Sequence, residues 1–189
     1  MRQGRLSSNR RVATGFSLIE LMVVVALVGI VTAIAVPSFR SMIETNRVAA
    51  EVNSFTGDLQ FARSEAIKRG LPVSICVSSN GTSCVNANTW QTGWIVFSDI
   101  DGSGTLGTGD SLLRKRPAWT GGDTFVAVPA TTTTITYNRD GFAQVPVGSG
   151  NALVLTLLTK SQNAAATRCV SLNRVGRYAV QTGGTGTCK

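Results

Sequence analysis

One long apolar segment constrains this chain more than any other part of its sequence. From Leu18 to Val36 the residues are apolar apart from Glu20 and Thr32. A run of about 19 residues is close to the shortest that spans a bilayer as a helix. Within lipid a single segment can satisfy its backbone hydrogen bonds only as a helix. The run therefore predicts a membrane-spanning helix.

A single carboxylate, that of Glu20, lies at the start of this run. A charged group is costly in lipid, so an acid at this position indicates a functional role. Gly15 and Phe16 precede it. A secretory signal peptide is the alternative interpretation, but no small-residue cleavage site follows the run and Glu20 would interrupt its core. The leader before Gly15 contains no acid and carries four arginines: Arg2, Arg5, Arg10 and Arg11.

This order of residues resembles the type IV prepilin signature. The resemblance implies that a prepilin peptidase of the inner membrane cleaves between Gly15 and Phe16 and methylates the new N-terminal phenylalanine. It also implies that Glu20 pairs with the N-terminal amine of a neighbouring subunit during filament assembly. Pro37 falls where many pilins carry a helix-kinking proline.

The positive charge of the chain is concentrated in the leader. The formal net charge is +8, and removal of the leader leaves 14 basic and 10 acidic side chains. Basic residues flanking a membrane helix stay in the cytoplasm, which sends the C-terminus outward. We therefore expect a single-pass protein of the bacterial inner membrane with a periplasmic head, carried to a pilus tip or the cell surface after assembly.

Beyond the apolar segment the pattern becomes amphipathic. Apolar residues recur at spacings of four and three, which predicts one buried stripe on a helix continuing to about Arg69. Arg47, Glu51 and Asp58 lie off this stripe, and a glycine and a proline then end the helix. The stripe consists of Val48, Val52, Phe55, Leu59, Ala62 and Ala66.

The remainder of the chain predicts β-strands, from alternating or continuous apolar runs. These runs are Val73–Val77, Trp94–Phe97, Thr134–Tyr137, Leu153–Thr159, Cys169–Leu172 and Arg177–Val180. Asp140 and Gly141 predict a hairpin turn. The expected fold is α+β, a mostly antiparallel sheet packed against one long helix. The expected organisation is a cleaved leader at 1–15, a transmembrane and assembly helix at 16–37, its amphipathic half at 38–70 and a β-rich head at 71–189.

Patches beyond the apolar segment refine the resemblance. They are Leu59–Gly70, Trp94–Asp99, Asp101–Gly104, Asp110–Arg114 and Gly176–Arg177, followed by a cysteine near the end of the chain. Together they are similar to the group that contains pseudopilin H and the minor pilins FimT and FimU. The resemblance implies a subunit that helps to initiate and cap a type IV pilus or a type II secretion pseudopilus. Its partners would be other minor and major pilins, contacted through the N-terminal helix.

The resemblance also raises a second function, because some FimT-type members bind DNA for natural transformation. In those receptors a Gly-Arg-x-Arg motif carries binding; here Arg177 matches the first arginine and an alanine stands at the second. Arginines on a loop suit contacts to phosphates that do not read sequence, so the expected partner is double-stranded DNA. The candidate residues are Arg168, Arg174, Arg177 and Lys189.

Four cysteines lie in the part of the chain expected outside the cytoplasm, where disulfides form. The sequence is compatible with three pairings, and we pair neighbours: Cys76 with Cys84 and Cys169 with Cys188. Each bond would close a short loop and stabilise the fold by roughly 2–3 kcal/mol. Metal ligation is a weaker alternative, because the chain has no histidine and no C-x-x-C pattern.

An acidic, glycine-rich loop is predicted between two strands. Asp99, Asp101 and Asp110 occupy positions 1, 3 and 12 of an EF-hand-like pattern, with Ser103 and Gly104 at positions 5 and 6. The last position holds aspartate instead of glutamate, and no flanking helices are predicted. These departures favour a polar turn over a calcium site.

The run Arg114, Lys115 and Arg116 follows this loop. Such a run on a strand is typical of a solvated face or a protected sheet edge, and a phosphate-contacting patch is the alternative.

The sequence predicts neither enzymatic activity nor a cofactor. Without histidine, Ser-His and Cys-His nucleophile pairs are excluded. The glycine-rich stretches at Gly102–Gly109 and Gly183–Gly186 lack the lysine and the strand–loop–helix context of a phosphate-binding loop. The chain is instead expected to be the substrate of the prepilin peptidase.

Overall fold

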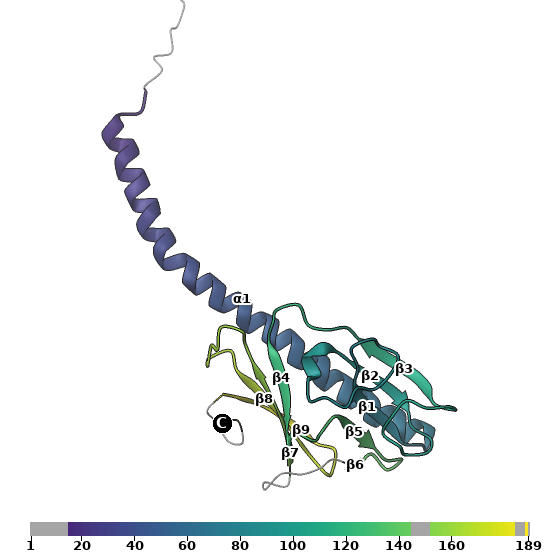
Figure 1. Cartoon of the computed structure of the whole chain (residues 1–189). Coiled ribbons are helices and arrows are strands. Elements are labelled where there is room, and N and C mark those ends of the chain that lie inside the picture. The colour runs from purple at the N-terminus through teal and green to yellow at the C-terminus, as the bar shows by residue number, and fades with distance from the viewer. Residues whose placement is uncertain (1–14, 145–151, 184–187, 189) are drawn as a thin grey trace, which may run out of the picture. The chain divides into compact units, whose positions relative to one another are not determined.

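A single long helix, α1, is the first element of the described chain. The computed structural model describes residues 15–144, 152–183 and 188. They fall into two compact units divided between Arg40 and Ser41, and α1 spans Leu18–Arg69 through both (Figure 1). The helix is followed by Gly70, whose φ of +66° lies in the left-handed region that glycine adopts without steric cost.

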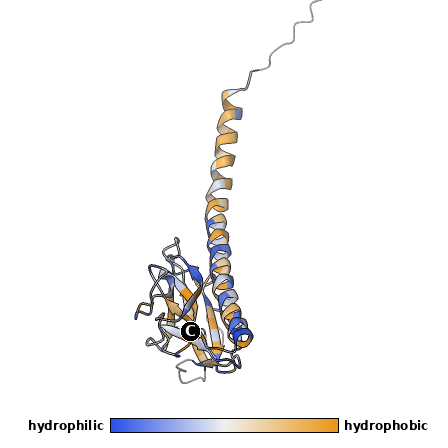
Figure 2. Ribbon diagram, turned by 90° about the vertical axis from the view of Figure 1, so that its right-hand side faces the viewer, coloured by the Kyte–Doolittle hydropathy of each residue, from blue (hydrophilic) through white to orange (hydrophobic). Residues whose placement is uncertain are grey.

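The first unit contains the apolar half of α1. Figure 2 shows mostly hydrophobic residues along this half, whereas hydrophobic and hydrophilic residues alternate along the half beyond Ser41. By length and composition the helix is able to cross a membrane, and its most apolar window has no buried residue. Pro37 lies within it. Proline has no N–H to donate, so the helix lacks one of its backbone hydrogen bonds there.

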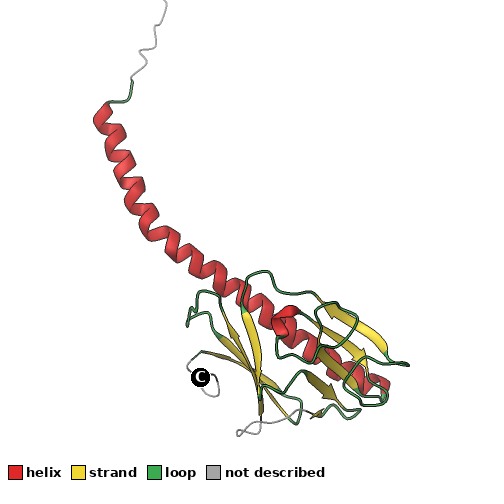
Figure 3. Cartoon of the chain, in the orientation of Figure 1, coloured by secondary structure: helices red, strands yellow, loops and turns green. Residues whose placement is uncertain are grey.

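The second unit holds the rest of α1, a short 3-10 helix η1 and nine strands among the described residues (Figure 3). Their bounds are β1 Val73–Val77, η1 Trp90–Thr92, β2 Trp94–Ser98, β3 Ser111–Arg116, β4 Thr124–Val128, β5 Thr134–Tyr137, β6 Ala143–Gln144, β7 Ala152–Leu158, β8 Arg168–Asn173 and β9 Tyr178–Thr182.

The strands form two sheets rather than the one that the sequence predicts. One sheet has the order β3-β2-β1-β5-β6 and the other has the order β4-β7-β8-β9. All of the strand pairs are antiparallel. Figure 1 shows the second half of α1 running behind both sheets. The expected α+β class is therefore confirmed, with the head divided into two sheets that share one helix.

The main core lies where the predicted stripe of α1 meets the two sheets. All six stripe residues are buried, with 2% or less of each exposed. Phe55 is at the centre of the contacts. Its ring meets those of Trp90, Trp94 and Phe125 edge to face, with centroids 5.5, 5.3 and 4.9 Å away. This geometry is favourable for aromatic pairs beyond the area that they bury.

Strands β1 and β2 are buried on both faces, although the alternation in β1 predicts one solvated face. On the side away from α1, Cys76, Ile95 and Phe97 form a second small cluster. Cys84 and Leu106 pack against it. These two residues belong to the loops that follow β1 and β2, so the loops supply the second cover of this sheet.

Candidate functional site

The predicted processing and assembly residues lie at the N-terminal end of α1. Gly15 and Phe16 are exposed and precede the helix. Ser17 begins it as a capping residue, because its Oγ accepts a hydrogen bond from the backbone N–H of Glu20 at 3.3 Å. Glu20 lies in the first turn. Among the described residues no basic group is within ion-pairing distance of this carboxylate.

Asp58 connects the second half of α1 to the sheet that contains β3. Its side chain is fully buried. Oδ1 accepts hydrogen bonds from Arg114 Nη1 at 2.8 Å and Arg116 Nη2 at 3.1 Å. Oδ2 accepts from Arg116 Nε at 2.7 Å and Trp94 Nε1 at 3.0 Å. Burial raises the pKa of Asp58, but the hydrogen bonds from the two arginines and the indole outweigh it, and the pKa is lowered.

This cluster adds to what the sequence indicates about Asp58 and the basic run. Asp58 is off the apolar stripe but buried, and the basic run is only partly a solvated face. The run lies on β3, which is the edge strand of its sheet, as one interpretation proposed. Arg114 and Arg116 are directed toward the helix, because alternate residues of a strand face the same side. Lys115 faces the other way, near Gly81.

A second ion pair connects α1 to the other sheet. Arg47 donates from Nε and Nη2 to the two oxygens of Asp123, at 2.9 and 2.8 Å. Asp123 is buried immediately before β4, and its Oδ1 also accepts from the Lys160 backbone N–H at 3.0 Å. Beside this pair, burial and the negative charge of Asp123 raise the pKa of Glu51 to about 7, against the opposing effect of Arg47.

The basic residues proposed for DNA do not all lie together. Arg174 and Arg177 are exposed in the turn between β8 and β9. Arg168 begins β8, at the far end from that turn, about 20 Å away at 3.4 Å per residue. Its Nη1 donates to two backbone carbonyls nearby, each at 2.8 Å. Lys189 lies outside the described residues.

Arg63 of α1 joins this turn, and sequence analysis did not single it out. It donates to the carbonyl oxygens of Gly176 at 3.2 Å and Val175 at 3.1 Å, while its buried Nε has no partner. Gly176 has a φ of +79°, and a Cβ there would lie 2.5 Å from the carbonyl oxygen of Gly141. The glycine is therefore required where the two turns and the helix meet.

A groove of about 510 Å³ lies along this contact. Arg63, Tyr137, Arg177 and Tyr178 are among its lining residues. Gln60 of α1 donates a hydrogen bond to the hydroxyl oxygen of Tyr178. Tyr137 is only 1% exposed, so the groove presents two guanidinium groups and the half-buried ring of Tyr178, which suits an anionic ligand that carries a flat group.

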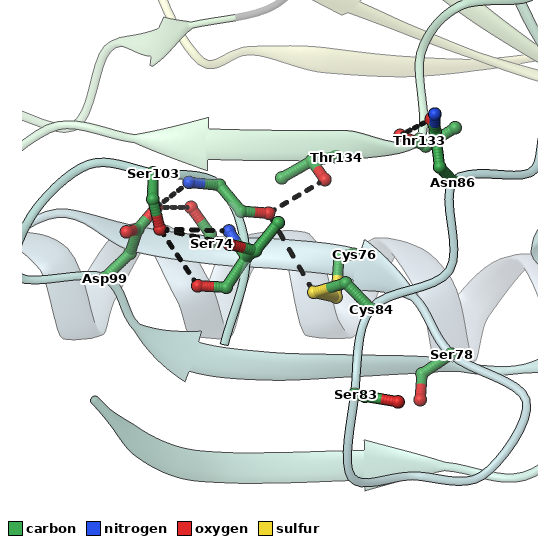
Figure 4. The surroundings of a disulfide bond; sticks show 12 residues. Ser74, Cys76, Ser78, Ser83, Cys84, Asn86, Asp99, Ser103, Thr133 and Thr134 are labelled. Carbon is green, nitrogen blue, oxygen red and sulfur yellow. Dashed lines mark hydrogen bonds between the residues drawn. A yellow bond between two sulfur atoms is a disulfide. The ribbon is translucent and has the colours of Figure 1, made fainter. Parts of the chain in front are cut away.

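Both expected disulfides are present in the structure. Cys76 is bonded to Cys84, with Cα atoms 5.6 Å apart, which confirms that pairing. Cys169 is bonded to Cys188, with Cα atoms 5.4 Å apart. The first bond holds the loop after β1 over the outer face of the sheet (Figure 4).

The structure also brings the three predicted acidic residues together. One carboxylate oxygen from each of Asp99, Asp101 and Asp110 lies within 4.8 Å of the other two. Asp99 is buried, Asp101 is exposed and Asp110 is intermediate. No flanking helices are present, as the sequence predicts, because the loop joins β2 to β3.

One long N-terminal apolar helix packed on antiparallel sheets defines a protein of the type IV pilin fold. Residues 51–176 match the family described as "Type II transport protein GspH". That match covers more than half of the chain, so the chain belongs to the GspH family. Residues 10–36 match the "Prokaryotic N-terminal methylation motif". The resemblance found in the sequence is confirmed, and the motif and apolar helix are those of a membrane-anchored pilin.

Solved structures and a curated relative are also similar to this chain. The type IV minor pilin FimU of Pseudomonas aeruginosa aligns with a TM-score of 0.53 at 20% identity, over 76% of this chain and 92% of that one, which shows the fold. The minor pseudopilin EpsH of Vibrio cholerae aligns with a TM-score of 0.48 at 13% identity, over 74% of this chain and 99% of that one. A type IV major fimbrial protein FimA of Dichelobacter nodosus is 34% identical over 94 residues, 50% of this chain and 51% of the relative. The chain thus spans about half the length of this curated relative.

Proposed function

We propose that this protein is a minor pilin or pseudopilin, a structural subunit that helps to initiate and cap a type IV pilus or type II secretion pseudopilus. The first half of α1 carries this proposal. It exposes large apolar side chains along its length, and Glu20 is its one acid. An apolar surface of this extent requires lipid or other helices around it. The subunit would lie in the inner membrane before assembly and against neighbouring pilin helices afterwards.

Maturation supplies the partner of Glu20 in this proposal. Prepilin peptidase cleaves after Gly15 and methylates the amine of Phe16, which leaves a cation at the start of the helix. An acid surrounded by apolar groups is least costly when it is paired with a cation. Glu20 of one subunit therefore pairs with the N-terminal amine of the next. The head is on the periplasmic side, because the basic leader remains in the cytoplasm.

The test uses the full chain expressed with its neighbouring pilins. We expect Glu20→Ala to be cleaved and methylated normally, but to co-purify with the other pilins several-fold less than the wild type. Asp140→Ala removes one negative charge from an exposed turn of the head and serves as the control. Co-purification of Glu20→Ala at the wild-type level would overturn the proposed role of this carboxylate.

Binding of double-stranded DNA by the displayed subunit is a second candidate function. The observation that favours it is the meeting of Arg63, Arg174 and Arg177 at one turn, beside a groove lined by the half-buried Tyr178. Phosphate contacts from arginines give affinity without sequence preference, and aromatic rings can stack on bases that become exposed.

Fluorescence anisotropy of a labelled duplex with the full chain in neutral detergent tests this function. We expect binding that weakens as salt rises, with the logarithmic slope reduced by about 0.9 for each phosphate contact that a variant loses. Arg174→Ala and Arg177→Ala should weaken binding. Lys160→Ala removes the same charge beyond the opposite end of β7 and should not. Equal losses in all three variants would indicate attraction by overall charge only.

A further inference from the structure

The loop from Asp99 to Asp110 holds a concentration of negative charge that the proposed assembly role does not use. Its three carboxylates have one oxygen each within 4.8 Å of the others. Like charges at this separation repel one another, and burial of one of them strengthens the repulsion because the surrounding dielectric constant is lower. Hydrogen bonds from the loop backbone offset part of this repulsion, and a bound cation would offset it more fully.

Asp99 provides an independent indication of a ligand. The side chain is fully buried. Its Oδ2 accepts hydrogen bonds from Ser74 Oγ at 2.6 Å and from the Gly104 backbone N–H at 3.0 Å. Its Oδ1 is buried and has no hydrogen-bond donor. A buried carboxylate oxygen without a donor is costly, and a bound cation would satisfy it.

The other two carboxylates are held in position by the loop backbone. Asp110 accepts from the N–H groups of Ile100 and Gly107, at 3.0 and 2.8 Å, one at each oxygen. Asp101 accepts from the Ser103 N–H at 3.0 Å through Oδ1. Because a carboxylate oxygen has two lone pairs, each of these atoms can still coordinate an ion.

The loop is also fixed to the sheet beneath it. Thr134 Oγ1 of β5 donates to the carbonyl oxygen of Gly104 at 3.1 Å, and Leu106 packs on the cluster around the Cys76–Cys84 disulfide. Figure 4 shows Asp99 beside Ser74 and Ser103, on the same side of the sheet as the disulfide. The site is thus built before any ion enters, which lowers the cost of ordering it on binding.

We propose that Asp99, Asp101 and Asp110 bind a calcium ion. Three atoms within 4.8 Å of one another can be enclosed by a circle with a radius of at most about 2.8 Å, so a slight contraction gives the calcium–oxygen range of roughly 2.3–2.6 Å. All donors are oxygen, which selects a hard cation. The exposed side of the loop leaves room for water, which suits the high and irregular coordination of calcium better than the strict octahedron of magnesium. The ion would neutralise the carboxylates and fasten the β2–β3 connection.

The test uses the full chain in a neutral detergent after removal of divalent cations. We expect titration with calcium chloride to give saturable heat with a Kd of about 10⁻⁴–10⁻³ M, the range of extracellular calcium modules. Saturating calcium should raise the Tm by on the order of 5 °C, and magnesium at the same concentration should raise it much less.

Asp101→Asn separates ion binding from a structural role of the loop. The exposed asparagine keeps an oxygen for the Ser103 N–H, so the loop should fold. In chelator this variant should be at least as stable as the wild type, because one repelling charge is gone. In calcium it should be less stable, with affinity reduced at least tenfold. Asp140→Asn, the control for loss of one exposed charge, should bind calcium normally. The proposal would be overturned if the wild type gave no heat on calcium titration. It would also be overturned if Asp101→Asn and Asp140→Asn lost calcium affinity to the same extent.

Discussion

At the scale of single residues, α1 places a charged carboxylate, that of Asp58, in the interior of the head. Asp58 is buried between α1 and β3, and its two oxygens accept four hydrogen bonds from Arg114, Arg116 and Trp94. A buried charge is tolerated when its partners satisfy it, and removing one member leaves the others unpaired. The two arginine side chains keep 38% and 39% exposure, so water partly replaces a lost carboxylate.

Asp58→Ala should therefore destabilise the fold by about 2–4 kcal/mol, near the lower limit for breaking a buried pair. Chemical unfolding of the full chain in detergent measures this. Because the folded-state pKa of Asp58 is lowered, its stabilisation is present above the usual pKa of 3.8 and is lost as the pH falls through the folded value. The stability of Asp58→Ala should therefore decrease less than that of the wild type as the pH falls through this range. Glu65→Ala, which removes a surface partner of Arg69, is the control and should change little.

Glu51 gives the opposite dependence on pH. Its folded-state pKa is raised to about 7 from 4.5, because it is buried near Asp123. The folded protein therefore holds a proton that the unfolded chain has released, and stability falls as the pH rises from about 4.5 to 7. Glu51→Gln mimics the protonated form.

We expect Glu51→Gln to raise the Tm at pH 8 by several degrees relative to the wild type and to leave it nearly unchanged at pH 4.5. Thermal unfolding at the two pH values measures the difference. A gain of equal size at both values would show that the proton on Glu51 is not the cause.

These residues also show where sequence interpretation reached its limit. The apolar stripe of α1 was predicted from spacing alone, and every member is buried. Asp58 and Glu51 lie off that stripe, so spacing gave no reason to expect them to be buried. The partners of Asp58 lie 56 and 58 residues further along the chain. Periodicity does not contain such pairings, because they depend on how distant strands meet the helix.

At the scale of elements, the Cys76–Cys84 bond supports an outer layer of the head. It closes a loop of 8 residues and, with Ile95 and Phe97, covers the face of the sheet opposite α1. Cys76→Ala combined with Cys84→Ala should cost about 2–3 kcal/mol of unfolding free energy, chiefly because the unfolded chain gains freedom. Chemical unfolding under oxidising conditions measures the loss.

The second disulfide provides a comparison within the same protein. Its sequence separation is 19, so the loop-closure model predicts that removing Cys169–Cys188 costs about 0.8 kcal/mol more than removing the first bond. A double variant at either bond that unfolds at the same denaturant concentration as the wild type would contradict this account.

Elements with strong local patterns were predicted and those defined by distant pairing were not. The helix was expected to end near Arg69, and it does. Val73–Val77 and Thr134–Tyr137 are strands with the expected bounds. Strand β4 was not predicted, although its residues Phe125 to Val128 form an apolar run. The other three strands of the second sheet were predicted, but not that they pair with β4, with Phe125 opposite Leu157, in a sheet of their own. Long-range pairing of this kind sets the topology but leaves little trace in a short run.

At the scale of the whole molecule, the sequence signature before α1 predicts a change of covalent structure. Cleavage after Gly15 would remove all four leader arginines and create a methylated amine at Phe16. We expect intact-mass and N-terminal analysis of protein from cells with the peptidase to show this mature chain. Gly15→Val should retain the leader, remain in the membrane fraction and fail to co-purify with other pilins. Cleavage of the variant at the same bond would contradict the assignment of the glycine.

Some of the candidate sites can be found from the sequence alone, whereas others are found only in the folded structure. The processing segment and the three aspartates were found from the sequence, because each set lies within one short stretch. The groove at the β8–β9 turn combines Arg63 of the helix with Arg177, which is distant in sequence. The predicted strand Cys169–Leu172 already separates Arg168 from Arg174, but nothing in the sequence indicates that Arg63 of α1 lies beside the β8–β9 turn.

The two ion pairs of α1 have a mechanical consequence. Arg47 joins the helix to the sheet that begins at β4, and Asp58 joins it to the sheet that ends at β3. The two attachments are 11 residues apart, about 17 Å along the helix axis. A pull along α1 therefore loads both attachments in shear and at the same time, and neither sheet can slide off the helix alone. If a force on the helix moved the subunit outward, the head would move as one body, because the two ion pairs would share the load.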